Sequence, residues 1–306
     1  NHYLKLAIRD LLKNKYYTVI NVLGLVFGML SALIIAKYIG GSLDFDSFHE
    51  KKDRIYSIAQ EESIQGNPQK SSKATYWGVG ELINQYPEVV ATTRYNYHIE
   101  SLIIADDDTG NSVSFFENKI FSVDSGFLKI FTFPLRYGNP ETALSRPNSI
   151  VITNTASERY FGKTNPVGKT LTVRVPWGAE TTYEVTGVTE DVPQRSQFRF
   201  DFLTTHLPLD PTEFWYVPDC STFVLLKADA NTEDFAAKLT KAVDDVPQLK
   251  STSKKVVLSL ESLADVQLST TAYLLIAVAI FTVIISWVNY INQVVAQSYW
   301  RMKEIA

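Results

Sequence analysis

Two long stretches without a charged residue limit what this chain can fold into more than any other feature. Residues 16–36 and residues 266–300 contain no Asp, Glu, Lys or Arg, and both are rich in Leu, Ile and Val. A helix needs about 20 apolar residues to cross the roughly 30 Å hydrocarbon core of a bilayer. The sequence therefore predicts two transmembrane helices, at 16–40 and at 272–298.

A cleaved signal peptide is the alternative for the first stretch, because basic residues precede it. The apolar part of a signal peptide is usually about 7 to 15 residues long, and this stretch is longer. No cleavage site of the small-x-small type precedes Tyr38. We therefore favour an uncleaved membrane anchor.

The charges beside the two stretches predict the orientation of the chain in the membrane. Basic residues exceed acidic ones both before the first stretch and after the second, and cytoplasmic flanks carry such an excess. Both ends are therefore expected in the cytoplasm. The segment 41–271 holds 22 basic and 31 acidic residues. An acidic outer domain argues against nucleic acid or anionic lipid as its main partner.

The first 15 residues have the pattern of an amphipathic helix. Apolar side chains recur at the helical spacing, and basic side chains occupy the other faces. The apolar set is Leu4, Ala7, Ile8, Leu11 and Leu12. An interfacial cytoplasmic helix at 1–15 is the expectation, and a plain extension of the spanning helix is the alternative.

The segment 41–271 between the two predicted spans has the pattern of an α+β domain. A strand, a helix and further strands are expected at 54–62, 75–86 and 89–105, and a second set at 222–228, 232–245 and 255–260. The residues between these sets are rich in strand patterns and turns. The sequence thus predicts a split βαβ layer at 46–105 and 219–262, with an inserted strand-rich subdomain at 106–218.

No motif for catalysis, cofactor binding or metal binding emerges. The stretch GKTNPVGKT at 162–170 has five residues between its glycines, where a phosphate-binding loop needs four, and it is expected to leave a helix and enter a strand. We interpret it as a turn around Asn165 and Pro166. Asp106, Asp107 and Asp108 lack the ligand order of a calcium loop and fit a hairpin turn.

The histidines and the single cysteine give no enzyme signature either. The four histidines are scattered, outside any metal or triad motif, and Cys220 has no partner for a disulfide within the chain. A half-buried thiol before a strand is the expectation for Cys220. The chain is therefore not expected to be an enzyme, and no cofactor or metal is expected in it.

Both spans carry residues that favour contact with other helices. In the first span small residues recur every four positions, which allows close backbone approach, although glycine is also common in membrane helices in general. In the second span amide side chains gather near the cytoplasmic end and need polar partners. The residues predicted to pack against a second copy, or against further helices, are Gly24, Gly28, Ala32, Asn289 and Gln293.

Several blocks of the sequence resemble one family. FHE at 48–50 followed by DRIY at 53–56 is similar to the segment that opens the periplasmic core domain of MacB/FtsX-like ABC transporter permeases. FTFPLRYGNPETAL, SIVITNTASERYFGKTNPVGKTL, VTGVTEDVPQRSQFRFDFL and VNYINQVVAQSYWRMKEIA follow in the order of the family. The likeness covers nearly the whole chain. One departure is Ala306, where the family usually has glycine.

The resemblance implies a permease of the mechanotransmission type in the bacterial inner membrane, with several spans and a large periplasmic domain. In this family the split βαβ layer is porter-like and carries the inserted second part. A separate cytoplasmic ATPase would bind ATP and magnesium, and a second permease copy or half, membrane lipid and a periplasmic adaptor are the other implied partners. Residues 299–306 would begin the segment that meets the ATPase, through Arg301, Lys303 and Glu304. The alternatives are a two-span receptor with a periplasmic sensor domain and, less favoured, a membrane-anchored enzyme.

Overall fold

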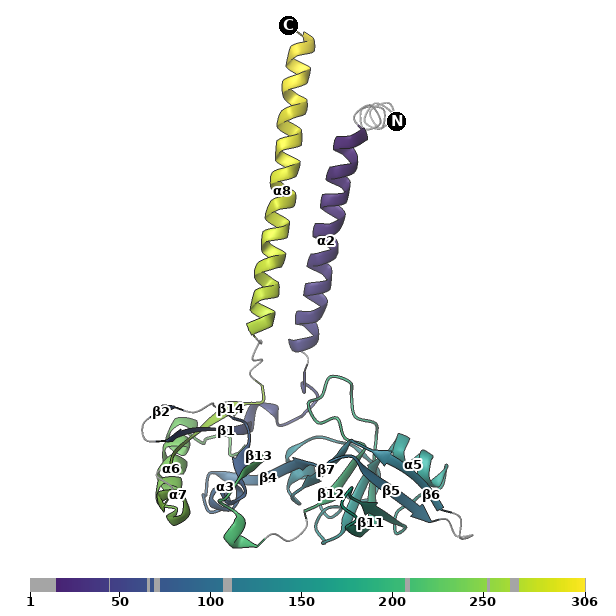
Figure 1. Ribbon diagram of the computed structural model, residues 1–306, viewed down its shortest axis with the longest axis vertical. Coiled ribbons are helices and arrows are strands. Elements are labelled where there is room, and N and C mark those ends of the chain that lie inside the picture. The colour runs from purple at the N-terminus through teal and green to yellow at the C-terminus, as the bar shows by residue number, and fades with distance from the viewer. Residues whose placement is uncertain are drawn as a thin grey trace. The chain divides into compact units, whose positions relative to one another are not determined.

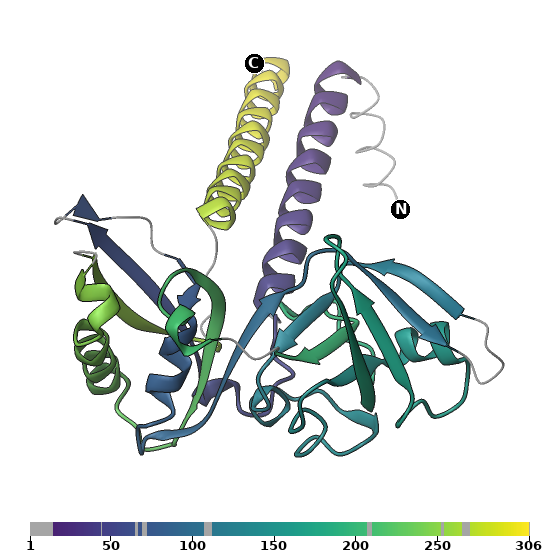
Figure 2. The same ribbon diagram turned by 60° about the horizontal axis from the view of Figure 1, so that its bottom comes forward.

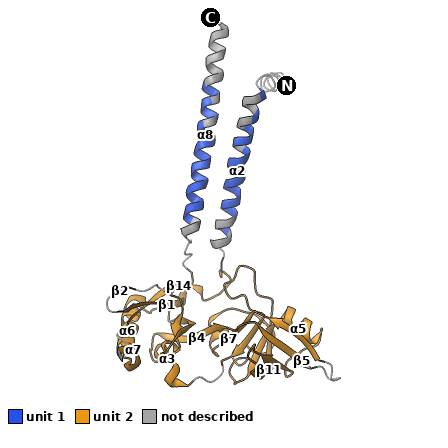
Figure 3. Cartoon of the chain, in the orientation of Figure 1, with its two compact units in different colours: residues 1–45, 266–306 blue, residues 46–265 orange. Residues whose placement is uncertain are grey.

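The computed structural model describes residues 15–43, 45–64, 67–68, 72–106, 112–206, 210–251, 254–264 and 270–305 (Figure 1). The predicted amphipathic helix at 1–15 lies almost wholly outside these residues. The chain divides into two units, a helical unit made of residues 1–45 and 266–306 and a domain of residues 46–265 (Figure 3).

The helical unit consists of α2 (Lys15–Leu43) and α8 (Thr270–Ile305). Most of their described apolar side chains are exposed, which suits contact with lipid. Within the described residues, Tyr273–Asn292 of α8 is long and apolar enough to cross a membrane, with a mean hydropathy of 2.3, whereas the apolar stretch of α2, Val22–Lys37, is shorter. One spanning helix is thus supported, and a second span at 16–40 stays a prediction.

The domain is a mixed α+β structure, as expected, in which 14 strands of the described residues join in one sheet. The strand order along its main path is β14-β1-β13-β4-β7-β12-β9-β11-β10-β5-β6. The strands are β1 (Ile55–Ile64), β2 (Asn67–Pro68), β3 (Thr75–Tyr76), β4 (Val89–Tyr97), β5 (Ser101–Asp106), β6 (Ser112–Glu117), β7 (Ile120–Val123), β8 (Leu135–Tyr137), β9 (Ser149–Thr153), β10 (Thr170–Arg174), β11 (Glu180–Thr189), β12 (Phe202–Thr205), β13 (Pro218–Leu226) and β14 (Lys254–Ser262). The helices are α3 (Trp77–Ile83), α4 (Phe127–Ile130), α5 (Asn154–Phe161), α6 (Thr232–Asp244) and α7 (Pro247–Ser251), with short 3₁₀ turns at Lys52–Arg54 and Pro211–Glu213.

We divide the domain at the pairing of β4 with β7 into two lobes, which lie side by side in Figure 2. Lobe 1 comprises residues 55–97 and 218–262, with α3, α6 and α7, and lobe 2 comprises residues 101–205, with α4 and α5. The predicted porter-like layer ended at residue 105, but β5 pairs with β6 and β10 and so belongs to lobe 2. Apolar and polar residues alternate through both β4 and β5, so the two strands look alike in the sequence. This alternation does not show which neighbouring strand each of them pairs with.

Each lobe has its own apolar core, and a third core lies between them. In lobe 1, α6 begins at the cap residue Asn231, whose side chain accepts hydrogen bonds from the backbone of Glu233 and Asp234. Its residues Phe235, Leu239 and Val243 recur every four positions and are buried. Ile150 and Ile152 of β9 are among the residues that form the core of lobe 2.

The core between the lobes is dominated by phenylalanine. Its members come from lobe 1 and from lobe 2: Ile55, Tyr95, Phe223 and Leu225 on one side, and Phe121, Val123, Phe127, Phe131, Phe133, Phe198 and Phe200 among those on the other. Burying an aromatic side chain stabilises a fold by roughly 1.5–3 kcal/mol. The two lobes are therefore held together chiefly by apolar contact on this face of the sheet.

Candidate functional site

The segment that follows α2 is fixed to the domain by a buried aspartate. Asp46 is only 3% exposed and has a left-handed backbone conformation, with φ of 52°, which aspartate tolerates better than most residues. Its Oδ1 accepts a hydrogen bond of 2.7 Å from the Ser196 hydroxyl, and the Gln197 backbone N–H lies 3.2 Å from Oδ1 and 3.3 Å from Oδ2. Its own N–H donates to the carbonyl oxygen of Arg195 over 2.9 Å.

His49 forms the second part of this anchor. The backbone N–H of Thr132 donates to Nδ1 over 3.1 Å, so Nδ1 is unprotonated and Nε2 carries the hydrogen. Nε2 lies 3.6 Å from Asp46 Oδ1, too far for a hydrogen bond but close enough for attraction. The ring is 1% exposed and packs at centroid distances of 5.1 Å and 5.3 Å from Phe131 and Phe133.

Two further contacts complete the anchor segment, by which we mean residues 46–51. The backbone N–H of Glu50 donates to Thr132 Oγ1 over 3.0 Å, and Lys51 Nζ donates to the carbonyl oxygen of Lys129 over 2.7 Å. These partners, like Arg195, Ser196 and Gln197, belong to lobe 2. The anchor segment therefore joins the chain from α2 to lobe 2, before β1 begins in lobe 1.

The chain leaves the domain for α8 from the other lobe. β14 pairs with β1 in antiparallel register from Tyr56–Ser262 to Ile64–Lys254. The N–H of Leu263 then donates to the carbonyl oxygen of Ile55 over 2.9 Å, which extends this attachment. The two long helices are thus connected to different lobes of one domain. In the sequence, residues 48–50 stood out only because they resemble a segment of the family. The sequence did not indicate that Asp46 and His49 are buried.

Within the helical unit, the predicted small-residue face of α2 contacts α8. Ser286 Oγ lies 3.3 Å from the carbonyl oxygen of Gly24 and 2.9 Å from that of Thr282, and it can donate to either. A Cβ atom on Gly28 would lie 2.5 Å from Ser286 Oγ, so the backbones approach as only glycine permits. Ala32 on the same face is half-buried.

The remaining predicted residues have no described side-chain contacts. The side chains of Asn289, Gln293, Arg301, Lys303 and Glu304 lie outside the described residues, although the backbone of α8 continues to Ile305. Their roles in packing and in coupling stay predictions. Gly24 and Gly28 were expected to meet a second copy or further helices, and the structure places them against α8 of the same chain.

No group of three or more His, Cys, Asp or Glu side chains among the described residues could hold a metal ion. The stretch 162–170 leaves α5 and enters β10, as expected. Cys220 lies inside β13 and is buried rather than half-buried, and burial raises the pKa of its thiol to about 12, so the thiol is unreactive at neutral pH.

Comparison with known proteins agrees with this architecture. The family described as MacB-like periplasmic core domain matches residues 18–242. A domain of a permease protein from Porphyromonas gingivalis has a similar fold, with a TM-score of 0.56 and 19% identity over 70% of this chain and 91% of that one.

Two other solved structures are more distant. The periplasmic region of MacB from Actinobacillus actinomycetemcomitans aligns with a TM-score of 0.46 and 13% identity, over 69% of this chain and 90% of that one. The extracellular domain of the ABC-type transporter YknZ from Gram-positive bacteria aligns with a TM-score of 0.39 and 13% identity, over 66% and 99%. No curated protein matches the sequence. The match over most of its length shows that this chain belongs to the family of MacB-like periplasmic core domains of ABC-type transporter permeases, as the five sequence blocks predicted.

Proposed function

We propose that this chain is the permease part of an ABC transporter in which a separate cytoplasmic ATPase moves the spanning helices and the helices move the periplasmic domain. The observation that carries the proposal is the anchor segment. A flexible linker after α2 would absorb a displacement, whereas residues 46–51 are tied to lobe 2 by several hydrogen bonds. Each such bond contributes about 0.5–1.5 kcal/mol, and those to a charged group contribute about 1.5–3 kcal/mol.

The proposed partners are those that the family resemblance implies. The ATPase supplies the site for ATP and magnesium and meets residues 299–306, including Arg301, Lys303 and Glu304. Lipid surrounds the exposed apolar side chains of α2 and α8. A second permease copy or half completes the membrane part, a periplasmic adaptor is a further candidate partner, and the acidic domain disfavours nucleic acid. The inner membrane would then hold a multi-pass protein with residues 46–265 in the periplasm.

The test of this division of labour is ATP binding and hydrolysis. The purified chain should neither bind nor hydrolyse ATP, and hydrolysis should begin only when the ATPase subunit is added. The change Lys169→Ala in the GKTNPVGKT stretch should alter neither result, because this stretch connects α5 to β10 and does not open a helix toward a phosphate. Saturable ATP binding by the chain alone that Lys169→Ala abolishes would contradict the proposal.

A two-span receptor with a periplasmic sensor domain is the alternative function. In a receptor, the signal travels from the domain to the cytoplasm, so a ligand of the domain is needed and ATP is not. Movement of the domain that depends on ATP hydrolysis by the added subunit separates the two functions.

A further inference from the structure

The attachment of the two long helices to different lobes directs attention to the junction between the lobes. Any displacement of α2 relative to α8 arrives at lobe 2 on one side and at lobe 1 on the other. Among the described strands, the lobes are joined only where β4 pairs with β7, through Tyr95–Val123, Asn96–Ser122 and Tyr97–Phe121. Three residue pairs alone resist twisting poorly, so the side chains on the two faces of this junction decide how firmly the lobes are aligned.

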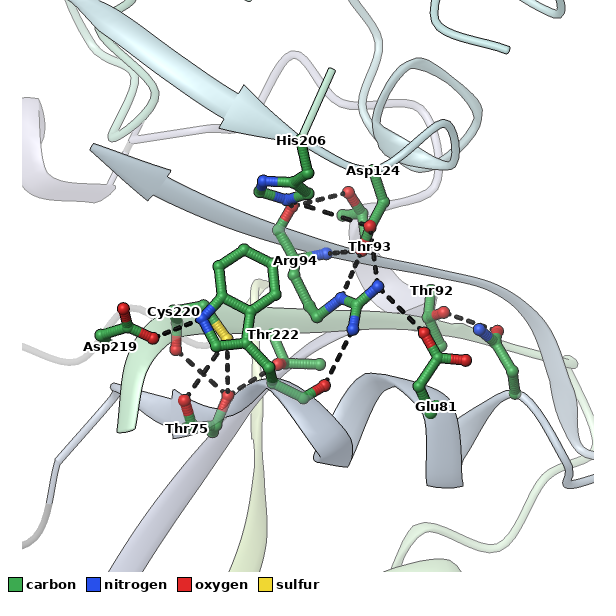
Figure 4. Close-up of polar contacts among 12 residues, drawn as sticks. Thr75, Glu81, Thr92, Thr93, Arg94, Asp124, His206, Asp219, Cys220 and Thr222 are labelled. Atoms are coloured by element: carbon green, nitrogen blue, oxygen red, sulfur yellow. Dashed lines mark hydrogen bonds and ion pairs between the residues drawn. The ribbon is translucent and has the colours of Figure 1, made fainter. Parts of the chain in front are cut away.

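An arginine and an aspartate join the lobes on one face of the junction (Figure 4). Arg94 lies in β4 of lobe 1, and Asp124 directly follows β7 of lobe 2. Arg94 Nε donates to Asp124 Oδ2 over 2.8 Å, and Nη2 donates to Oδ1 over 2.9 Å. The Arg94 backbone N–H also donates to Oδ2 over 2.7 Å, and the Asp124 N–H donates to the Arg94 carbonyl oxygen over 3.2 Å. The pair is therefore bidentate and is fixed at its backbone as well.

The arginine is held just as firmly within its own lobe. Its Nη1 donates to the carbonyl oxygen of Trp77 over 2.9 Å, and its Nη2 lies 3.1 Å from a Glu81 carboxylate oxygen. The guanidinium lies over the Trp77 ring at 5.2 Å from the centroid. A Cβ atom on Gly80 would lie 2.8 Å from Arg94 Cδ, so α3 closes tightly over this side chain. The Arg94 side chain is only 12% exposed.

The residue that directly follows lobe 2 closes the cluster from the other side. His206, directly after β12, packs edge-on against the Trp77 ring at a centroid distance of 4.5 Å, and its Nε2 lies 3.4 Å from the Arg94 carbonyl oxygen. Trp77 Nε1 in turn donates to an Asp219 carboxylate oxygen of β13. The cluster thus links α3, β4 and β13 of lobe 1 to Asp124 and His206 of the other side.

The two faces of the junction differ in how strictly they hold the relative position of the lobes. On the aromatic face, Tyr95 stacks on Phe121 and Phe223 at centroid distances of 5.4 Å and 5.9 Å, and such apolar contact is favourable over a range of relative positions. A bidentate ion pair is directional and tolerates little displacement. We propose that Arg94 is a positioning residue that holds the two lobes in one alignment, so that a displacement received by the anchor segment reaches the lobe that carries α8. The source of the displacement rests on the proposed function, whereas the alignment of the lobes does not.

The alignment can be tested on the full chain in lipid nanodiscs without any ATPase. Spin labels are placed at Lys163→Cys, next to α5 of lobe 2, and at Lys241→Cys on α6 of lobe 1, two exposed positions. Cys220 is retained because its thiol is buried. Pulsed electron double resonance should give one narrow distance distribution for the otherwise unchanged chain. Arg94→Gln should broaden it and add a component at another distance, and Arg94→Lys, which keeps the charge but loses the fork, should give an intermediate width.

The matched control is Arg136→Gln, which removes an arginine whose Nη1 donates to Asn154 Oδ1 within lobe 2, and it should leave the distribution unchanged. If Arg94→Gln does not fold by circular dichroism, Arg94→Lys decides, because it leaves a positive charge beside the half-buried Asp124 carboxylate. A distribution as narrow in the folded Arg94 variants as in the control would overturn the inference. A failure of the proposed function would give a different result. The chain with Arg94 unchanged would keep its narrow distance distribution, and that distribution would not change when the ATPase and ATP are added.

Discussion

A largely buried histidine at the lobe junction makes the stability of the domain depend on pH. Burial lowers the pKa of His206 from 6.5 to about 4, although the charge of Asp124 opposes this shift. The neutral ring is thus favoured in the fold, where it packs on Trp77. His98 is half-buried, and its partial burial lowers its pKa as well.

The sign of the effect follows from which state binds the proton. Above pH 6.5 the His206 ring is neutral in the folded and in the unfolded state. Between pH 6.5 and about 4 only the unfolded chain takes up the proton, so the free energy of unfolding decreases as the pH is lowered. Below about pH 4 both states are protonated and the decrease levels off. Because a tenfold difference in proton affinity corresponds to about 1.4 kcal/mol, His206 accounts for a loss of about 3 kcal/mol. Urea denaturation followed by tryptophan fluorescence should show this loss, and His206→Gln should remove most of it while leaving the share of His98. An equally steep pH dependence in His206→Gln would contradict the assignment.

A second residue-scale prediction concerns the glycine at the contact of α2 with α8. Gly28→Leu must displace Ser286, because even a Cβ atom would lie 2.5 Å from its Oγ. Overpacking of this kind costs typically about 1–3 kcal/mol and separates the helices. Transport per ATP in the complete permease should fall, while circular dichroism shows the domain still folded.

The chain provides its own control for Gly28. Gly40 lies on the same helix, and a Cβ atom there meets nothing within 4 Å. Gly40→Leu should therefore retain normal transport per ATP. Equal results for the two variants would mean that the close approach at Gly28 does not matter for coupling.

At the scale of elements, the anchor segment is the part whose role the sequence conceals. The sequence alone predicted the apolar runs of the long helices, the small-residue spacing in α2 and the position of α6. It also predicted that a helix precedes the stretch 162–170 and a strand follows it. Asp46 and His49, by contrast, act through partners about 80 to 150 positions away, at Thr132 and Ser196. Local pattern contains no information on such contacts. The same reason explains why the sequence could not show that β5 pairs with β6 and β10.

The contribution of the Asp46 carboxylate can be isolated with Asp46→Asn. Asparagine also tolerates the left-handed conformation, so the change removes the charge without adding backbone strain. The charge-assisted bonds from Ser196 and Gln197 weaken, and we expect a loss of about 1–2 kcal/mol of local stability. Hydrogen exchange at the backbone amide of Gln197 should accelerate.

The reciprocal change serves as the control for this variant. Asn148 is an exposed residue with φ of 54°, and Asn148→Asp exchanges the same two side chains at a left-handed position outside the anchor segment. It should leave exchange at Gln197 unchanged. Unaltered exchange in Asp46→Asn would show that the carboxylate does not hold the segment.

At the scale of the whole molecule, the sequence could predict that an acidic α+β domain sits between two apolar helices, because length, charge and periodicity are properties of the chain itself. The attachment of the helices to separate lobes depends on strand order, β14-β1-β13-β4 on one side of the junction and β7-β12-β9 on the other, and emerges only from the folded structure. In the proposed function, this arrangement would let movement of the helices become movement of the domain.

In the proposed function, hydrolysis of ATP by a separate subunit moves the domain. The most direct measurement places a donor dye at Lys163→Cys, an exposed position of the domain, and acceptor dyes in the lipid headgroups of nanodiscs that contain the permease and its ATPase. Energy transfer should change when ATP is hydrolysed, should not change without the ATPase or with a non-hydrolysable analogue, and should change less in Asp46→Asn. Constant energy transfer while the complex hydrolyses ATP would contradict the proposed function.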